Sequence, residues 1–467
     1  MQIVVLMAFV VALTLADLAP VVTGRWLVMP ALVTYLGGAV AVGAFRTALS
    51  LRAIGRSPDA LPGSLRRHNL MTLVGQGWLV AGLGGVILAG YGRWVLDDLL
   101  LGRVPLAGEV AILCPFVVAL LLNWLLEYPL YRVMRARIGE QQVLAGLRPR
   151  PAWTRGEYLG YNVRHYLLFV AVPVGLIVLL SDSLRLLGAY LPEPAGEVVA
   201  MGGSIACAGG VFLCAPLLIV RVWRTAPLPA GRLREELWEV CRNAKLTCRD
   251  LLVWRSGGLI ANAGVMGLIG PLRYVLLSDA LLEQMDDRQI KAIFAHEVGH
   301  IRSHHLFYAL LFALSSVMLC SAAGELTAGA LHLAWWAEQT ITLSLLMAAW
   351  LVAFGWISRR FERQSDVIAA WASGPDGPTP DGKITPEGAA IFSLALEQVA
   401  HLNGLSARQG NWRHGSIAGR VAYVMWLGGT GGTRGPIDRV VRRIKTALWG
   451  ALAAGLALVA ARLVWEL

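Results

Sequence analysis

The residues with the clearest chemistry are two histidines and a glutamate within residues 293–300, where the sequence reads IFAHEVGH. His296 and His300 are four positions apart, so on a helix both imidazoles project from one face and can reach a single Zn²⁺. Glu297 lies beside them, within reach of a water held at such an ion. This HExxH pattern predicts that His296 and His300 bind zinc and that Glu297 is the general base of a hydrolytic reaction.

The flanking sequence predicts the helix that this spacing requires. Asp286 is followed three residues later by Gln289, the pattern of a capping box at a helix start. Apolar residues then recur at helical spacing and form a face that can be buried. They are Ile290, Ile293, Phe294 and Ile301.

A catalytic zinc site needs three protein ligands and one open position, so HExxH is incomplete by itself. Glu362 is the best candidate for the third ligand. It lies 62 residues after His300, but two apolar spans between them would form a hairpin that brings the chain back. On a helix, Asp366 would follow one turn later and could orient a ligand histidine through its other ring nitrogen. Alternatively, Glu362 is an ordinary charge at a helix end, paired with Arg359 or Arg363.

The composition is that of a membrane protein. Of the 467 residues, 56% are hydrophobic and only 15% are charged, a balance that a soluble protein rarely has. The net charge of +11 comes from basic residues in short loops beside apolar spans, so it follows the positive-inside rule and does not indicate nucleic-acid binding. The six cysteines have no CxxC spacing, which argues against a cysteine zinc site or a disulfide framework.

A membrane helix needs about 20 apolar residues, and nine stretches are candidates, the first of them short and weak. The predicted spans are residues 2–16, 26–45, 70–91, 109–126, 166–180, 198–220, 306–323, 334–357 and 447–467. Arginine and lysine gather in alternate loops, after the second and fourth spans and before the last one. Because these residues are retained on the cytoplasmic side, we expect residues 223–304 and 358–446 to lie in the cytoplasm, at a bacterial inner membrane.

This pattern predicts five segments. An N-terminal membrane region of about six spans covers residues 1–222, and a cytoplasmic segment with the HExxH helix covers 223–304. A membrane hairpin covers 305–357, a second cytoplasmic segment with Glu362 covers 358–446, and the last span covers 447–467. Short β-like runs at 251–254, 259–266 and 273–277 predict a small sheet before the HExxH helix. The expected fold is thus mainly α, a polytopic helical membrane protein with a small α+β zincin-like domain at the cytoplasmic surface.

The combination of His296-Glu297-Val298-Gly299-His300 with Phe361-Glu362-x-x-x-Asp366 across two spans resembles the membrane zinc metallopeptidases. This family includes the CAAX prenyl endopeptidase and the HtpX-like heat-shock proteases, and the likeness extends roughly from Pro227 to Tyr423. Upstream, Ala261-Asn262-Ala263 through Gly267 is similar to the edge strand whose backbone pairs with a peptide substrate. Downstream, Trp412-Arg413-His414-Gly415-Ser416 through Arg420 is similar to a His-Pro-Ser-x-x-x-Arg element, with Gly415 where proline is common.

The resemblance implies a zinc metalloendopeptidase with one Zn²⁺ per chain, held by His296, His300 and Glu362. Glu297 would take a proton from the attacking water and pass it to the leaving amine, and His414 would help to stabilise the oxyanion. Asn262 and Ala263 would bind the substrate, a peptide or a membrane protein in the lipid bilayer.

Two other functions fit parts of the pattern. An intramembrane site-two-type protease also uses HExxH, but takes its third ligand from an Asp in an LDG motif, which this sequence lacks. A transporter or a non-catalytic membrane scaffold with a structural or vestigial metal site would explain the many spans. The intact Glu297 argues against the second alternative, because a purely structural site does not need a general base.

Overall fold

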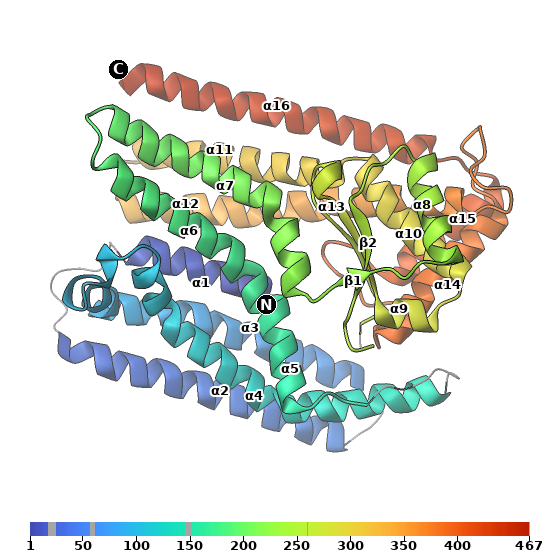
Figure 1. Cartoon of the computed structure of the whole chain (residues 1–467), viewed down its shortest axis with the longest axis horizontal. Coiled ribbons are helices and arrows are strands. Elements are labelled where there is room, and N and C mark those ends of the chain that lie inside the picture. Colours follow the sequence, from blue (N-terminus) through green and yellow to red (C-terminus); the bar gives the residue numbers. More distant parts are fainter. Residues whose placement is uncertain (17–24, 57–60, 145–148, 150, 259, 467) are drawn as a thin grey trace. The chain divides into compact units, whose positions relative to one another are not determined.

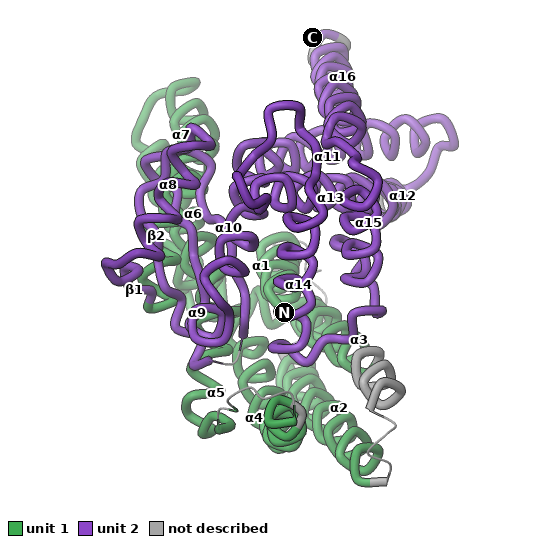
Figure 2. The backbone as a smooth tube through the Cα atoms, turned by 90° about the vertical axis from the view of Figure 1, so that its right-hand side faces the viewer, with its two compact units in different colours: residues 1–224 green, residues 225–467 purple. Residues whose placement is uncertain are grey.

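The structure is a computed structural model that describes residues 1–16, 25–56, 61–144, 149, 151–258 and 260–466. Two compact units cover residues 1–224 and 225–467 (Figure 2). Both are mainly helical, and one small sheet lies in the second unit (Figure 1). Among the described residues, eight helices are long and apolar enough to cross a membrane. The predicted class, a polytopic helical membrane protein with a small α+β part, is therefore confirmed.

The first unit is a bundle of long helices. In Figure 1, α2, α3 and α4 lie side by side, and α6 packs against α7. The helices are α1 (Gln2–Leu15), α2 (Val28–Arg56), α3 (Leu61–Val86), α4 (Ala107–Leu144), α5 (Arg155–Asn162), α6 (Leu168–Gly188) and α7 (Ala195–Val222). Short 3₁₀ turns cover Arg25–Leu27 and Leu101–Arg103, and π-helical turns cover Ile87–Tyr91, Trp94–Asp98 and Val163–Leu167.

Helix α1 differs from the weak first span predicted for residues 2–16. With 14 residues it is about 21 Å long, shorter than the roughly 30 Å of a hydrocarbon core. Its residues Val5 and Ala8 are fully buried, because α1 packs against α3 and α4 inside the unit. In the described part of the first unit, five helices instead of six therefore have the length of a membrane span.

The second unit begins with a four-stranded sheet in the order β1-β2-β4-β3. The strands are β1 (Ala226–Pro227), β2 (Asp250–Trp254), β3 (Ala263–Met266) and β4 (Tyr274–Ser278). Strands β2 and β4 are parallel, while β1 and β3 pair antiparallel with their neighbours. The three predicted runs correspond to β2, β3 and β4; Leu259, the first residue of the second run, lies outside the described residues.

Strand β3 begins four residues later than predicted because the preceding chain wraps around a carboxylate. The backbone N–H groups of Ser256 and Gly258 and the Ser256 hydroxyl donate to Asp279. Asp279 is the first residue of α9 (Asp279–Gln284), directly after β4. These bonds hold the turn against the start of α9, so the chain becomes extended only at Ala263.

The rest of the second unit is helical. Its helices are α8 (Arg232–Asn243), α10 (Asp287–Arg302), α11 (His305–Ala330), α12 (Trp335–Ala348), α13 (Gly355–Ala372), α14 (Pro386–Leu402), α15 (Ile417–Thr430) and α16 (Gly435–Glu466). A 3₁₀ turn covers Gly270–Leu272, and a π-helical turn over Ala349–Phe354 joins α12 to α13. Helix α11 packs against both α12 and α16, so α11 and α12 form an apolar hairpin whose return leg continues into α13 (Figure 1).

Candidate metal centre

Helix α10 presents the HExxH residues, and its start is as the sequence predicts. The Asp286 carboxylate accepts from the N–H of Gln289 at 2.8 Å, and the Gln289 side chain accepts from the N–H of Asp286. This confirms the capping box. The predicted apolar face is buried, with Ile290 1% and Phe294 0% exposed. Burial of this face fixes the rotation of α10, so that His296 and His300 face α13.

Helices α10 and α13 approach each other closely at Gly299. A Cβ atom built on Gly299 would lie 3.1 Å from the Cα of Ser365, closer than ordinary van der Waals contact. Ser365 is itself fully buried. A glycine at this position therefore lets α13 bring Glu362 and Asp366 to the histidine face of α10.

The three predicted ligands meet at this contact. The Nε2 atoms of His296 and His300 are 3.2 Å apart, and they lie 3.7 and 3.5 Å from the two carboxylate oxygens of Glu362. Four ligands at about 2.0–2.1 Å from a tetrahedral zinc are separated from one another by about 3.3 Å. The observed separations fit such an ion, and two imidazoles with a carboxylate are the donor set of a catalytic zinc site.

Asp366 contacts the outer nitrogen of the first ligand. Its Oδ1 lies 3.0 Å from Nδ1 of His296, so Nδ1 carries the proton and Nε2 is left for a metal. Asp366 is 1% exposed, and Arg420 of α15 donates to both of its oxygens at 2.6 and 2.8 Å. Arg420 also lies 3.4 Å from Glu362. One guanidinium therefore compensates two buried carboxylates, a role that the sequence analysis did not assign to it.

Burial and charge shift the pKa values of the HExxH residues. Burial and the neighbouring His296 lower the pKa of His300 to about 4, so His300 is neutral at physiological pH, as a ligand must be. Burial would also lower the pKa of His296, but the hydrogen bond and charge of Asp366 and the charge of Glu362 raise it. Burial raises the pKa of Glu297 above its ordinary value. A carboxylate that holds its proton more tightly is a better base for the attacking water.

His414 reaches the site from a tight turn before α15. Its Nδ1 lies 2.8 Å from Oε1 of Glu362, and 43% of its side chain is exposed. Asn411 and Gly415 exchange backbone hydrogen bonds across the turn, and Gly415 has a φ of 76°. Proline, with φ fixed near −65°, could not adopt this conformation. Gly415, which stands where proline is common in the family pattern, is therefore required by this turn, and the turn places His414 beside Glu362.

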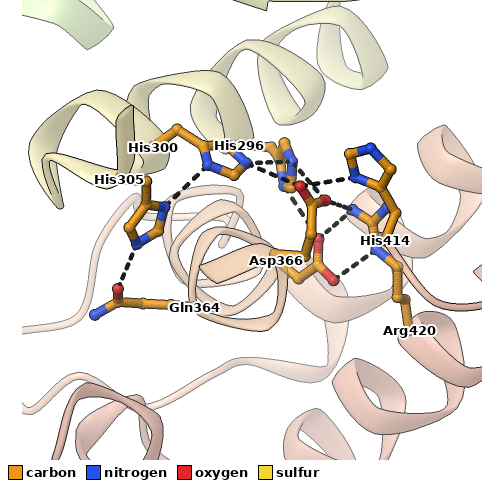
Figure 3. A network of polar contacts seen from close by, with 8 residues as sticks. His296, His300, His305, Gln364, Asp366, His414 and Arg420 are labelled. Carbon is orange, nitrogen blue, oxygen red and sulfur yellow. Dashed lines mark hydrogen bonds and ion pairs between the residues drawn. The ribbon is translucent and has the colours of Figure 1, made fainter. Parts of the chain in front are cut away.

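His305 also lies beside the metal centre, although its sequence position favours a place at the membrane interface, because it directly precedes an apolar span. Its Nδ1 lies 2.9 Å from Nδ1 of His300, and its Nε2 lies 2.9 Å from Oε1 of Gln364. Figure 3 shows this contact between His305 and Gln364. His305 is 4% exposed, so it is part of the buried surroundings of the metal centre.

Strand β3 forms the open edge of the sheet, since the described residues place no strand on its other side. The backbone of Asn262 is turned inward: its C=O accepts from the N–H of Ser278, and its N–H donates to the Ser278 hydroxyl. Inward and outward residues alternate in an antiparallel ladder. Ala263 and Val265 thus direct their N–H and C=O groups to the open edge, whereas Asn262, expected with Ala263 to bind substrate, does not.

Comparison with known proteins supports the class that the site defines. Residues 227–384 match the family model described as Peptidase family M48. This match confirms the likeness to the membrane zinc metallopeptidases, whose members are zinc-dependent. It spans β1 to the loop before α14 and includes His296, Glu297, His300, Glu362 and Asp366. A comparison with curated protein sequences gives no significant match.

Among solved structures, the chain is similar to one titled "Crystal Structure of S. mikatae Ste24p". The sequence identity is 13% and the TM-score is 0.46, over 85% of this chain and 99% of that chain. A likeness at this level carries no argument about function. The chain is a multi-pass membrane protein that matches a metallopeptidase family model and brings together two histidines and a glutamate that could hold a metal ion.

Proposed function

We propose that this protein is an integral-membrane zinc-dependent endopeptidase with one zinc ion per chain. The observation that carries the proposal is the convergence of His296, His300 and Glu362 at separations of 3.2–3.7 Å, with Glu297 on the same helix as the histidines. The family match over residues 227–384 supports it. Zinc held by these three residues would supply Lewis acidity, polarising the scissile carbonyl and making water a stronger acid.

The side chains around this position have separate roles in the proposed reaction. Glu297 takes the proton of the attacking water and delivers it to the leaving amine. Asp366 and Arg420 hold His296 in place, so that the ligands need little rearrangement during the reaction. His414 can donate a hydrogen bond to negative charge that develops on the carbonyl oxygen, because its imidazole is partly exposed beside Glu362.

The substrate we propose is an extended segment of a membrane-associated or misfolded membrane protein. Strand β3 contacts α10, and a peptide paired with the open edge of β3 would run past the HExxH helix. Pairing through backbone atoms tolerates many side chains, which suits a protease for damaged proteins. The site would face the cytoplasm, since the basic loops fall on the side of the membrane that carries α10 in the predicted topology. Cleavage of prenylated CAAX proteins would require a prenylating host.

Removing the metal tests the activity directly. We expect the purified protein in detergent to cleave an unfolded membrane protein, to lose the activity with a zinc chelator and to regain it with added Zn²⁺. Mass spectrometry of the products should find new N-termini within the substrate sequence, as expected for an endopeptidase. Cleavage that persists after complete removal of zinc would contradict the proposal.

The edge strand can be tested by replacing Val265 with proline. The N–H of Val265 points to the open edge, so proline removes a donor to the substrate without removing a bond to β4. Loss of one backbone hydrogen bond, worth about 0.5–1.5 kcal/mol, should lower kcat/KM roughly two- to twelvefold. Val265→Ala is the matched control, since it shortens the side chain and keeps the N–H. Equal kcat/KM values for the two variants would argue against pairing at this edge.

A further inference from the structure

The outer nitrogens of the two histidine ligands have different partners among the described residues. The outer Nδ1 of His296 faces Asp366 at 3.0 Å, whereas the outer Nδ1 of His300 faces another imidazole, that of His305, at 2.9 Å. Two imidazole nitrogens can share a hydrogen bond only if one carries a proton and the other does not. If Nδ1 of His300 carries the proton, Nε2 of His300 is available to a metal. The groups that determine which Nδ1 atom is protonated therefore control the metal site.

The carboxylate of Asp438, at the far end of the chain of contacts, determines which of these nitrogens carries the proton. Nε2 of Gln364 donates to Oδ1 of Asp438 at 2.6 Å, and Arg434 holds the other oxygen of Asp438 at 3.3 Å. If the amide were reversed, its oxygen would face the carboxylate, with no hydrogen between them. Asp438 thus orients the amide of Gln364, and its Oε1 faces His305.

The orientation of Gln364 then determines both histidine tautomers. Oε1 of Gln364 can only accept a hydrogen bond, and it lies 2.9 Å from Nε2 of His305. Nε2 of His305 therefore carries a proton and donates it to Oε1. A neutral imidazole has one N–H, so Nδ1 of His305 is an acceptor, and Nδ1 of His300 is the donor to it. The remaining nitrogen of His300, Nε2, keeps its lone pair and faces Glu362.

Three features of the fold hold His305 in this position. His304, between α10 and α11, has a left-handed φ of 53°, which turns the chain back so that His305 lies against His300. The ring of Phe361 stacks on His305, with centroids 4.2 Å apart and planes at 4°. Lys445 of α16 donates to the C=O of Ser303 in the same turn. A left-handed conformation is uncommon for residues other than glycine, although asparagine, aspartate and histidine adopt it more often than the rest.

We propose that His305 is a positioning residue for the metal. Together with Gln364 and Asp438 it fixes the tautomer and ring orientation of His300, as Asp366 does for His296. A carboxylate thus sets the tautomer of each histidine ligand. Asp366 contacts His296 directly, whereas Asp438 acts on His300 through Gln364 and His305. The inference rests on the proposed zinc site, of which His300 is a ligand.

The test measures zinc affinity by competition with a chelator, using the full-length protein in detergent. His305→Phe keeps the ring that stacks on Phe361 but removes both nitrogens, and Gln364→Leu removes the acceptor. We expect each to weaken zinc binding about 10- to 100-fold, the usual effect of losing a partner of a metal ligand. His305→Gln should retain affinity within a few-fold, because its amide can accept from His300 and donate to Gln364.

The controls separate tautomer control from packing. His401→Phe on α14 makes the same replacement at an exposed histidine outside the hydrogen-bond chain, so its zinc affinity should equal that of the wild type. Melting temperatures of the metal-free proteins show whether each variant is folded. Unchanged affinity in folded His305→Phe and Gln364→Leu, or an equal loss in His305→Phe and His305→Gln, would overturn the inference. A wild-type protein that binds no zinc would instead overturn the proposed function.

Discussion

Replacing Glu297 with glutamine should abolish most of the peptidase activity while zinc remains bound. Glutamine has nearly the same shape as glutamate, but its amide cannot accept the proton of the attacking water. A positioned general base typically raises the rate 10²- to 10⁴-fold, so we expect kcat to fall at least about 10²-fold. Zinc content should stay at one ion per chain, because Glu297 is not among the three residues whose ligand atoms converge.

The measurement is a turnover assay paired with metal analysis of the same preparation. A loss of activity together with zinc would mean that the substitution disturbs α10, and a loss of activity with zinc retained identifies Glu297 as the base. Full activity of Glu297→Gln would exclude the proposed mechanism. It would then favour the alternative in which the metal site of this membrane protein is structural and any cleavage comes from a contaminant.

The HExxH helix could be predicted from local sequence because every signal for it lies within about one helix length. The capping residues Asp286 and Gln289, the apolar face and the two histidines all belong to α10. Spacing on one helix determines which side chains share a face. The approach of Glu362 could also be anticipated, since two apolar spans between it and His300 can only form a hairpin.

The contacts of His305 could not be predicted in the same way. On a continuous helix, a residue five positions after His300 would lie well away from its face. His304, between α10 and α11, has a left-handed conformation that changes the direction of the chain. Histidine adopts this conformation more often than most residues, but that preference is too weak to predict the turn. Gln364 and Asp438 are 74 positions apart, so their hydrogen bond depends on how α13 packs against α16.

The role of Arg420 could not be predicted from the sequence for a related reason. The motif that contains it suggested a position near the site, but motif spacing does not tell which carboxylate a guanidinium binds. The structure places it on Asp366 with two hydrogen bonds. The inward backbone of Asn262 likewise depends on the register of β3 with β4, and a shift of one residue would exchange the inward and outward positions.

Replacing Glu362 with alanine should remove zinc from the protein, unlike the change at Glu297. The substitution deletes the third donor, and the two histidines left behind form an incomplete site. We expect zinc affinity to fall by more than the roughly 10- to 100-fold that follows the loss of an outer partner of a ligand, with activity lost in parallel. Competition with a chelator and metal analysis of the purified variant measure this effect.

The matched control is Glu397→Ala on α14, which removes an exposed glutamate and should leave zinc binding unchanged. Glu362 also accepts from His414 and lies 3.4 Å from Arg420, so its loss could act through packing. Glu362→Asp separates the two effects, because it keeps the charge for His414 and Arg420 but withdraws the oxygens by one methylene. We expect this variant to fold like the wild type and to bind zinc with an intermediate affinity. Full zinc stoichiometry and affinity in Glu362→Ala would mean that another residue is the third ligand, and the convergence of α10 and α13 would then need a different explanation.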